Sequence, residues 1–148
     1  MKWAYITWIF LHTYANKIKN DYFINNKVNC LGVIKYICWH LPCPICEKHA
    51  RQYLKNNPLE VCKKKEDLIN YIWNFHNSVN KMLKKPIYSF DELQLYNRAY
   101  FLKITKLFLK EFSRNYYFSG KIMSGNKRKI AGNVIRKWLS SIWSNFEL

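Results

Sequence analysis

The chain has 148 residues, 49 % of them hydrophobic and 18 % aromatic, with only 4 glycines and 4 prolines. This length suits one domain with a modest extension, and so few breaker residues exclude a β-sandwich or a barrel. The 25 basic and 9 acidic residues give a formal charge of +16, which favours polyanionic partners and says nothing about the fold. A solvated basic surface explains this charge most simply, and nucleic acid stays an open candidate partner.

Apolar residues recur at helical spacing along most of the chain, which predicts an all-α fold. The expected helices cover about residues 3–20, 26–41, a short stretch from the break at 41–44 to about 56, then 66–83 and 89–112. Short connections between such helices give a bundle. The last of these helices is expected to bury one apolar stripe, formed by Leu93, Tyr96, Tyr100, Ile104 and Leu107.

Beyond residue 112 the character of the chain changes. Residues 113–126 resemble an irregular linker, and residues 127–146 are expected to form a basic amphipathic helix. Such a helix can pack back on the bundle or on a second subunit, or serve as an arm for an acidic partner or a membrane surface. Packing is favoured because the apolar stripe is continuous and aromatic, with Ile130, Val134, Trp138, Ile142 and Phe146 in phase.

No run of residues comes close to the ~18 apolar residues needed to span a bilayer, so no transmembrane segment is expected. A short apolar stretch at residues 3–11 lacks the small-residue cleavage site of a secretory signal. Five cysteines are an odd number, so at least one thiol has no partner within the chain. These features favour a cytoplasmic protein that is not secreted.

The chemistry of the chain concentrates in the segment Cys43-Pro44-Ile45-Cys46. With Cys43 at the N-cap of a helix and Pro44 at its first position, the helix dipole and free N–H groups would stabilise a Cys43 thiolate. Cys46, one turn into the helix, is expected to be the less exposed sulfur. Such a pair suits dithiol exchange, although thioredoxin-like proteins and zinc sites use the same spacing. The thioredoxin alternative needs a βαβ context, whereas these surroundings are helical.

A zinc site is the other alternative, because potential ligands repeat at every third position in His40, Cys43, Cys46 and His49. The chain could then be a zinc-binding structural module or a nucleic-acid-binding module. A structural zinc site usually gathers its ligands from two separate segments, and a single helix cannot surround one ion tetrahedrally. We therefore expect no metal at these residues.

The predicted helix at residues 66–83 carries two stripes. One is a core stripe, and the second, displaced by about 100°, consists of Ile69, Trp73, His76 and Asn80, with Asn77 beside it. Trp8 and His12 repeat the same pairing of indole and imidazole on the first helix. These side chains suit a planar, polar, partly buried ligand that needs stacking surface and hydrogen bonds, and flavin with its adenosine tail meets that description.

Several short motifs occur in one order along residues 3–100. They are Trp8-x-x-Leu11-His12, Cys43-Pro-Ile-Cys46-x-x-His49, Asn57-Pro58, the run Phe75-His76-Asn77-x-Val79-Asn80-x-x-Leu83, and Lys85-Pro86. In order, spacing and residue type this pattern resembles the Erv/ALR family of FAD-linked sulfhydryl oxidases, most of all the short forms carried by large cytoplasmic DNA viruses. A viral member would work in the cytoplasm of an infected host cell or in the virion.

The resemblance implies that residues 1–112 form a four-helix bundle that cradles FAD, with a short fifth helix. It also implies a homodimer, which is usual in the family. Residues 113–148 are left as an extension. By resemblance, a substrate dithiol attacks Cys43, Cys46 lies next to the flavin, and electrons pass through the Cys43–Cys46 disulfide to FAD and then to O₂, giving H₂O₂. Protein dithiols and molecular oxygen would be the reaction partners. The expected FAD contacts are Thr7, Trp8, His12, His49, Trp73, His76, Asn77, Asn80, Lys85, Tyr88 and Phe90.

The chain departs from the family pattern at its other cysteines. Family members commonly have a structural disulfide whose first cysteine would fall near Cys62, but its second position is occupied here by Phe90. No second shuttle pair of cysteines is present. Cys30 and Cys38 lie on one predicted helix about 12 Å apart, too far to bridge each other. Direct access of substrates to Cys43 is therefore favoured.

Overall fold

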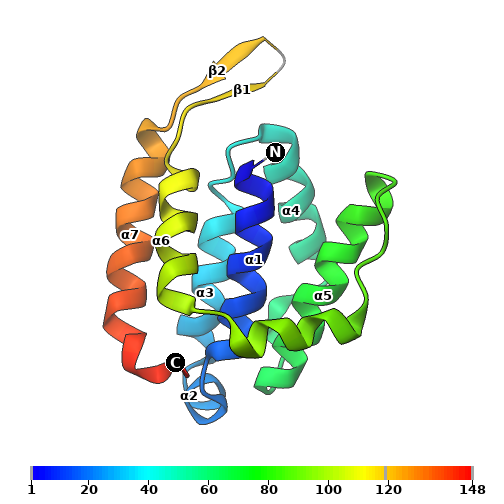
Figure 1. Cartoon of the computed structure of the whole chain (residues 1–148), viewed down its shortest axis with the longest axis vertical. Coiled ribbons are helices and arrows are strands. Elements are labelled where there is room, and N and C mark those ends of the chain that lie inside the picture. The colour runs from blue at the N-terminus through cyan, green and yellow to red at the C-terminus, as the bar shows by residue number, and fades with distance from the viewer. Residues whose placement is uncertain (1, 119, 148) are drawn as a thin grey trace.

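The computed structural model describes residues 2–118 and 120–147, and it is helical, as the sequence predicts (Figure 1). Its α-helices are α1 (Lys2–Lys17), α2 (Asn20–Asn25), α3 (Lys27–Cys38), α4 (Pro44–Asn56), α5 (Lys65–Met82), α6 (Phe101–Phe112) and α7 (Asn126–Ile142). Short 3-10 segments are η1 (Leu59–Val61), η2 (Phe90–Arg98) and η3 (Trp143–Asn145), and a hairpin is formed by β1 (Tyr116–Phe118) and β2 (Lys121–Met123). None of the described helices has both the length and the apolar character needed to cross a membrane.

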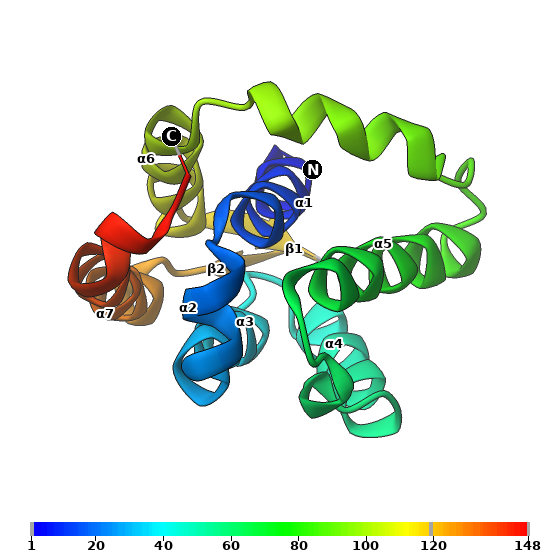
Figure 2. The same ribbon diagram turned by 90° about the horizontal axis from the view of Figure 1, so that it is seen from below.

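Helix α1 lies at the centre of the bundle, between α6 on one side and α5 on the other (Figure 2). Its side chains Phe10 and Tyr14 are fully buried, because neighbouring helices cover α1 from several sides. Phe10 stacks on Phe108 of α6, with ring centroids 4.3 Å apart. This central position makes α1 the element on which both the site and the C-terminal helices are assembled.

Local signals set the ends of α4 and α5, as the sequence predicts. Cys43 is the N-cap of α4, with Pro44 in the first turn. At the start of α5 the Asp67 carboxylate accepts hydrogen bonds from the N–H groups of Lys63 and Lys64, at 2.9 and 3.1 Å. These contacts satisfy backbone donors that have no partner within a helix. Both helices therefore begin and end within a residue or so of the predicted positions.

Two predicted helices are wrong in length. The first ends at Lys17, and the short helix α2 follows it. The helix expected over 89–112 is broken at Ala99 and Tyr100, whose ψ angles of 137° and 94° are extended. The break changes the helical phase, so Tyr100 and Leu107 are exposed, and the buried face of α6 instead consists of Phe101, Thr105, Phe108, Glu111 and Phe112.

The C-terminal part packs back on the bundle, which confirms the favoured alternative. Helix α7 lies against α6 and α3, and the Nε1–H of Trp138 donates to Oδ1 of Asn29. A Cβ added at Gly32 of α3 would lie 2.7 Å from the Trp138 ring, so glycine permits this approach. Of the predicted stripe, Ile142 and Phe146 are buried and Trp138 packs against the core, as expected, whereas Ile130 and Val134 are exposed. The buried residues of α7 are Arg128, Ala131, Gly132, Ile135, Leu139 and Ile142.

The end of α1 is joined to the end of the described chain. The N–H of Lys19 donates to the carbonyl oxygen of Asn145 at 2.8 Å, and the N–H of Glu147 donates to that of Lys17 at 2.6 Å. Ile18 and Phe146 form an isolated antiparallel bridge between these two bonds. The first and last helices are thus connected by backbone hydrogen bonds as well as by packing.

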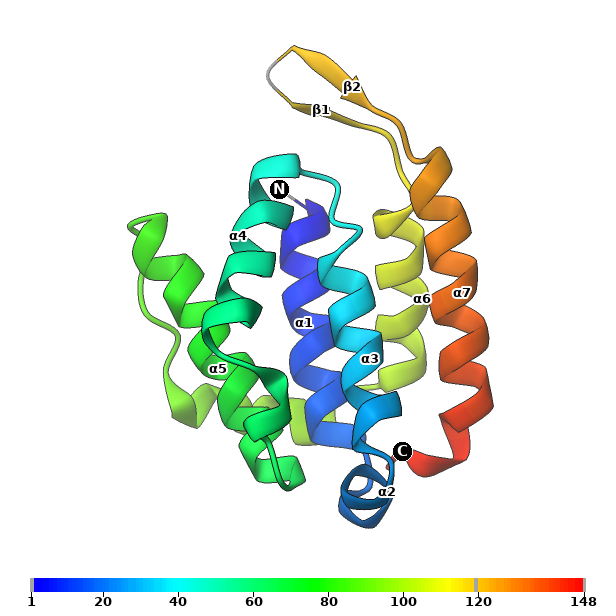
Figure 3. The ribbon, with the colours of Figure 1, turned by 180° about the vertical axis from the view of Figure 1, so that it is seen from behind.

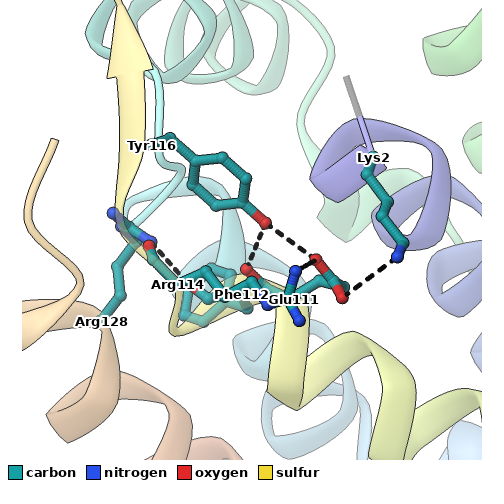
Figure 4. A network of polar contacts seen from close by, with 6 residues as sticks. All are labelled: Lys2, Glu111, Phe112, Arg114, Tyr116 and Arg128. Carbon is teal, nitrogen blue, oxygen red and sulfur yellow. Dashed lines mark hydrogen bonds and ion pairs between the residues drawn. The ribbon is translucent and has the colours of Figure 1, made fainter. Parts of the chain in front are cut away.

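The expected linker forms the antiparallel hairpin β1–β2, which projects beyond the ends of α6 and α7 (Figure 3). The buried guanidinium of Arg128 fixes its base by donating to four backbone carbonyls at 2.6–3.0 Å, those of Phe112, Arg114, Met123 and Ser124. Figure 4 draws Arg128 with two of these residues, Phe112 and Arg114. Nearby, the Tyr116 hydroxyl donates to the carbonyl oxygen of Glu111 at 2.6 Å. A guanidinium at the C-terminus of α6 is also favoured by the helix dipole.

Candidate active site

Cys43 and Cys46 lie at the tip of α4, where the chain enters the helix. The backbone N–H of Cys46 donates to Sγ of Cys43 at 3.3 Å, so the Cys43 side chain performs the role of an N-cap acceptor. Both sulfurs are free thiols, as are those of Cys30, Cys38 and Cys62. The predicted placement of Cys43 at the N-cap is confirmed.

The exposure of the two cysteines is the reverse of the prediction. Cys43 is only 3 % exposed, whereas Cys46 is partly exposed. Cys43 is the N-cap residue, and its sulfur accepts the Cys46 N–H instead of facing solvent. Burial, a hydrogen bond with Cys43 and the charge on Cys43 raise the pKa of Cys46 to about 12. The Cys46 thiol is therefore protonated at neutral pH.

His12 of α1 and His76 of α5 form the centre of a second cluster. Nε2 of His12 and Nδ1 of His76 are 2.9 Å apart and share one hydrogen bond. The Trp8 indole stacks on His76 with a centroid distance of 4.3 Å and an interplanar angle of 10°. The spacing along the sequence predicts Trp8 and His12 on one face of the first helix, and the packing of α1 against α5 brings them to His76.

Both imidazoles are neutral. Burial, together with His76, lowers the pKa of His12 to about 3, and burial, together with Lys85, lowers the pKa of His76 to about 4. Within the described residues, Nδ1 of His12 and Nε2 of His76 have no hydrogen-bond partner. In a neutral hydrogen-bonded pair one of these free nitrogens carries a proton and the other a lone pair. The pair therefore offers a ligand one donor and one acceptor.

Residues 84–98, which we call the strap, cross α1 and α5 over this pair. Asn77 holds the strap at Tyr88: the N–H of Tyr88 donates to Asn77 Oδ1 at 2.7 Å, and Asn77 Nδ2 donates to the Tyr88 carbonyl at 3.0 Å. Trp73 Nε1 donates to the same carbonyl at 2.8 Å. Asn80 Nδ2 lies 3.4 Å from Asn77 Oδ1, and the Phe90 ring meets Trp73 edge-on at 5.4 Å.

Two tyrosine rings of the strap cover the histidines. Tyr88 lies 5.7 Å from His12 and 5.6 Å from His76, between ring centroids. Tyr96 stacks on His12 at 5.0 Å with an interplanar angle of 19°. The sequence analysis missed Tyr96 as a site residue, since it assigned Tyr96 to an apolar stripe. Its position depends on the path of the strap, for which the sequence offers no local signal.

The other expected contact residues are Thr7, Lys85 and His49. The Thr7 hydroxyl is buried and donates to the Trp3 carbonyl at 2.6 Å. Lys85 is exposed at the start of the strap. His49 is exposed on α4 and lines a cavity of about 240 Å³ between α4 and α5, together with Tyr53, Phe75 and Val79 among others. The roles expected of these three residues stay predictions.

The four residues of the zinc alternative do not gather around a common point. His40 Nδ1 donates to the Tyr36 carbonyl at 2.6 Å, and its ring stacks on Tyr36. Across residues 2–118 and 120–147, no three His, Cys, Asp or Glu side chains are arranged to hold a metal ion. The structure therefore gives the zinc alternative no support.

The site thus combines a dithiol at one helix tip with a neutral imidazole pair under aromatic rings. Residues 5–100 match the sequence model of the Erv1/Alr family. The chain belongs to the Erv1/Alr family. This match covers both the Cys43–Cys46 segment and the His12–His76 cluster, and it ends directly before α6 begins at Phe101.

Three relatives of this Erv1/Alr chain carry the name FAD-linked sulfhydryl oxidase. The FAD-linked sulfhydryl oxidase of African swine fever virus (isolate Tick/Malawi/Lil 20-1/1983) is 35 % identical over 92 residues, which cover 62 % of this chain and 76 % of the relative. The FAD-linked sulfhydryl oxidase ERV1 of Oryza sativa subsp. japonica is 29 % identical over 82 residues, covering 55 % and 42 %. A relative from Invertebrate iridescent virus 3 is 31 % identical over 85 residues, covering 57 % of each chain. No solved structure matches this chain significantly.

Proposed function

We propose that this Erv1/Alr chain is an FAD-dependent thiol oxidase that forms disulfide bonds in protein substrates. The observation that carries the proposal is the Cys43–Cys46 pair at the N-terminus of α4, within a family match that includes it. Protein dithiols are the substrates, and molecular oxygen is the final electron acceptor. The relatives named FAD-linked sulfhydryl oxidase support the same chemistry.

The second cluster has the donor set that a flavin nucleotide needs. Trp8 and Tyr96 supply flat aromatic faces, and the free nitrogens of His12 and His76 supply one donor and one acceptor. Lys84 and Lys85 at the start of the strap place positive charge nearby, which suits a diphosphate. We propose that these residues hold FAD, with Thr7, His49, Trp73, Asn77, Asn80, Tyr88 and Phe90 as further contacts. When bound, FAD takes two electrons from the reduced cysteine pair and passes them to O₂, giving H₂O₂.

The chain's own sulfurs perform the thiol exchange. A substrate thiolate attacks one sulfur of the Cys43–Cys46 disulfide, forms a mixed disulfide and releases the other sulfur as a thiolate, which takes up a proton. A second substrate thiolate then attacks the substrate sulfur of the mixed disulfide, which closes the substrate disulfide. Two substrate thiols are thereby oxidised, and Cys43 and Cys46 are left reduced.

We propose Cys43 as the sulfur that the substrate attacks, as the family resemblance implies. The exposures of the two free thiols favour the opposite order of attack, because Cys46 is more exposed than Cys43. Trapping distinguishes the two orders. Each single-cysteine variant is offered a substrate peptide whose thiol is activated as a mixed disulfide with thionitrobenzoate, so that the remaining enzyme thiolate displaces thionitrobenzoate and keeps the peptide as a mixed disulfide. If Cys43 is the attacked sulfur, the Cys46→Ser variant retains the peptide, and the Cys43→Ser variant does not.

The test of the function is a visible spectrum combined with oxygen uptake. The purified protein is expected to be yellow, to consume oxygen with dithiothreitol and to release H₂O₂. Cys43→Ser and Cys46→Ser should each remove oxygen uptake while the yellow colour stays, and Cys30→Ala, which changes a buried cysteine outside the pair, should keep both. A colourless protein that takes up no added flavin would overturn the proposal.

We propose in addition that the protein is a homodimer in the cytoplasm of an infected host cell or in the virion. The sides of α1 and α3 that face α6 and α7 are covered within one chain, so a dimer would have to use other faces. Light scattering of the purified protein measures the oligomeric state. Nucleic acid is the other candidate partner. If the protein binds it, immobilised single-stranded RNA should retain the protein at low salt and release it steeply as the salt concentration rises.

A further inference from the structure

The outer face of α4 carries an open, shallow groove that begins at Pro44, the residue after Cys43. Its volume is about 360 Å³, and it is lined by Pro44, Glu47, Lys48, Arg51, Gln52 and Lys55. These positions recur three and four residues apart, so they form one stripe along the helix. A peptide lying on this stripe would therefore end at the tip of α4 beside Cys43, whereas Cys46, at about 100° per residue, points to the other side of the helix.

The charges in the groove leave two lysines unpaired. Glu47 accepts a hydrogen bond from Arg51 at 2.7 Å, and the same guanidinium lies 5.2 Å from the centroid of the Trp39 ring. The single acidic side chain of the groove is thus neutralised by Arg51. Among the described residues, no carboxylate pairs with the exposed lysines Lys48 and Lys55.

The fold does not use this face of α4 for packing. The helix lies at the periphery of the molecule, beside α3 and α5 (Figure 2). Of its thirteen residues, Ala50 and Leu54 are the buried ones, and both point away from the groove stripe. Ile45, next to the groove, is 52 % exposed. The face therefore combines unpaired positive charge with exposed apolar surface at the end of α4 that carries Cys43.

We propose that this groove binds an acidic segment that adjoins the reactive cysteines of the protein substrate. The proposal rests on the thiol oxidase function and names the class of its substrates. Charge complementarity is the physical reason, because carboxylates placed beside Lys48 and Lys55 would be attracted without displacing an existing partner. The Arg51 fork, already held by Glu47 and Trp39, forms the fixed wall of the groove.

The helix geometry also sets the spacing of the acidic residues. Lys48 lies about 6 Å from Pro44 along the helix axis, and Lys55 lies about 10 Å further on, at 1.5 Å per residue. An extended peptide advances about 3.3 Å per residue. The acidic side chains are therefore expected about two and about five residues from the reactive cysteine.

An acidic peptide fits this groove better than nucleic acid does. Two unpaired lysines on one helix face could neutralise about two phosphates, whereas tight non-specific binding takes several such contacts. The sulfurs at the end of the groove also react with thiols, which nucleic acids lack. The RNA alternative is kept as an outcome of the test.

The experiment compares two dithiol peptides that differ at two positions only. One carries Glu two and five residues from a Cys-x-x-Cys pair, and the other carries Gln there. The ratio of their kcat/KM values is measured for the wild type, for Lys48→Glu/Lys55→Glu, and for the control Lys103→Glu/Lys106→Glu. The control makes the same change of charge on exposed residues of α6, across the bundle from α4.

We expect the wild type to prefer the acidic peptide about tenfold at low salt. The α4 variant should lose this preference, the α6 variant should keep it, and dithiothreitol should be oxidised equally by all three. A wild-type ratio near one, or an equal loss in both variants, overturns the proposal. The proposal is also overturned if the only change in the α4 variant is a loss of retention on single-stranded RNA.

Failure of the oxidase function would be visible separately. If the wild type oxidises neither peptide nor dithiothreitol, the function is wrong, while fluorescence anisotropy with serine-substituted copies of both peptides still tests the groove. Tighter binding of the acidic copy, lost in Lys48→Glu/Lys55→Glu alone, supports the groove in that case. Equal binding of both copies overturns it.

Discussion

The neutral histidine pair between α1 and α5 determines how single residues of the site respond to pH. His12 has a pKa of about 3 and His76 a pKa of about 4, against an ordinary value of about 6.5, mainly because both rings are buried. Protonation would place positive charge under the Trp8, Tyr88 and Tyr96 rings without a carboxylate partner. The folded protein therefore resists taking up these protons.

Acidification is expected to destabilise the fold already at pH values above those at which carboxylates titrate. Between pH 6.5 and about 4 the unfolded chain binds two protons that the folded chain does not bind, so stability falls as pH falls. The loss is up to about 1.4 kcal/mol per pH unit for each histidine. Urea unfolding at pH 7, 6 and 5 measures this slope. The variant His12→Asn/His76→Asn should flatten this slope, and a slope that stays the same in this variant would contradict the prediction.

The central residues of the cluster could be predicted, and the covering residues only in part. Helical periodicity places Trp8 with His12, and Trp73 with His76, on defined faces of two helices. The meeting of these two faces depends on how α1 packs against α5, which periodicity does not fix. Tyr88 was expected from the family resemblance. The contact of Tyr96 with His12 depends on how the strap returns across α1 after Lys84, whose φ is 57°. No local rule fixes that path.

At the level of elements, Arg128 joins the end of α6, the hairpin and the start of α7. Its guanidinium is buried and its partners are backbone carbonyls rather than a carboxylate. Gly125 permits the start of α7 to lie close to Ser113 at the end of α6, because a Cβ at Gly125 would lie 2.1 Å from the Ser113 carbonyl oxygen. The orientation of the hairpin is therefore fixed at its base.

Arg128→Met should release the hairpin while the helices stay folded. Four carbonyls lose their donor, and the expected loss of stability is about 2–3 kcal/mol. Hydrogen exchange at residues 116–123 should become much faster, whereas exchange in α5 should change little. Arg136→Met, an exposed arginine of α7, should alter stability by less than about 0.5 kcal/mol. Unchanged exchange in the hairpin would show that Arg128 does not hold it.

Elements with strong local signals could be predicted well. The Cys43–Pro44 start of α4 and the Asp67 cap of α5 are short-range signals, and both helices fall where expected. The break at Ala99 and Tyr100 and the phase of α7 depend on tertiary contacts. In particular, Phe101 and Phe108 both pack on Phe10 of α1, at 5.8 and 4.3 Å, which fixes the phase of α6.

At the level of the whole molecule, α6 and α7 complete a core that begins in the family-matched part. The match ends at residue 100, yet Phe108 and Ile135 are among the most buried side chains of the chain. The ring of Phe101 also stacks on Trp143 at 5.0 Å. The expected boundary between residues 112 and 113 stays a prediction, and residues on both sides of it share this core.

Phe108→Ala should therefore destabilise the entire protein rather than its C-terminal part. Removing this fully buried ring is expected to cost about 3–5 kcal/mol. Leu107→Ala, one residue earlier and 42 % exposed, should cost less than about 1 kcal/mol. Denaturant unfolding followed by circular dichroism should remain one transition, and hydrogen exchange in α5 and α7 should speed up together. Two separate transitions would show that residues 101–147 fold as an independent unit.

The bridge between Ile18 and Phe146 has a consequence for synthesis in the cell. The ribosome makes α1 well before the residues that close its far end and cover its Phe10 face. Long-range contacts of this kind form slowly, and an apolar helix waiting for its partner is exposed to aggregation. Nascent chains should therefore need a chaperone until α6, α7 and Phe146 have been made, and slower translation should prolong that need.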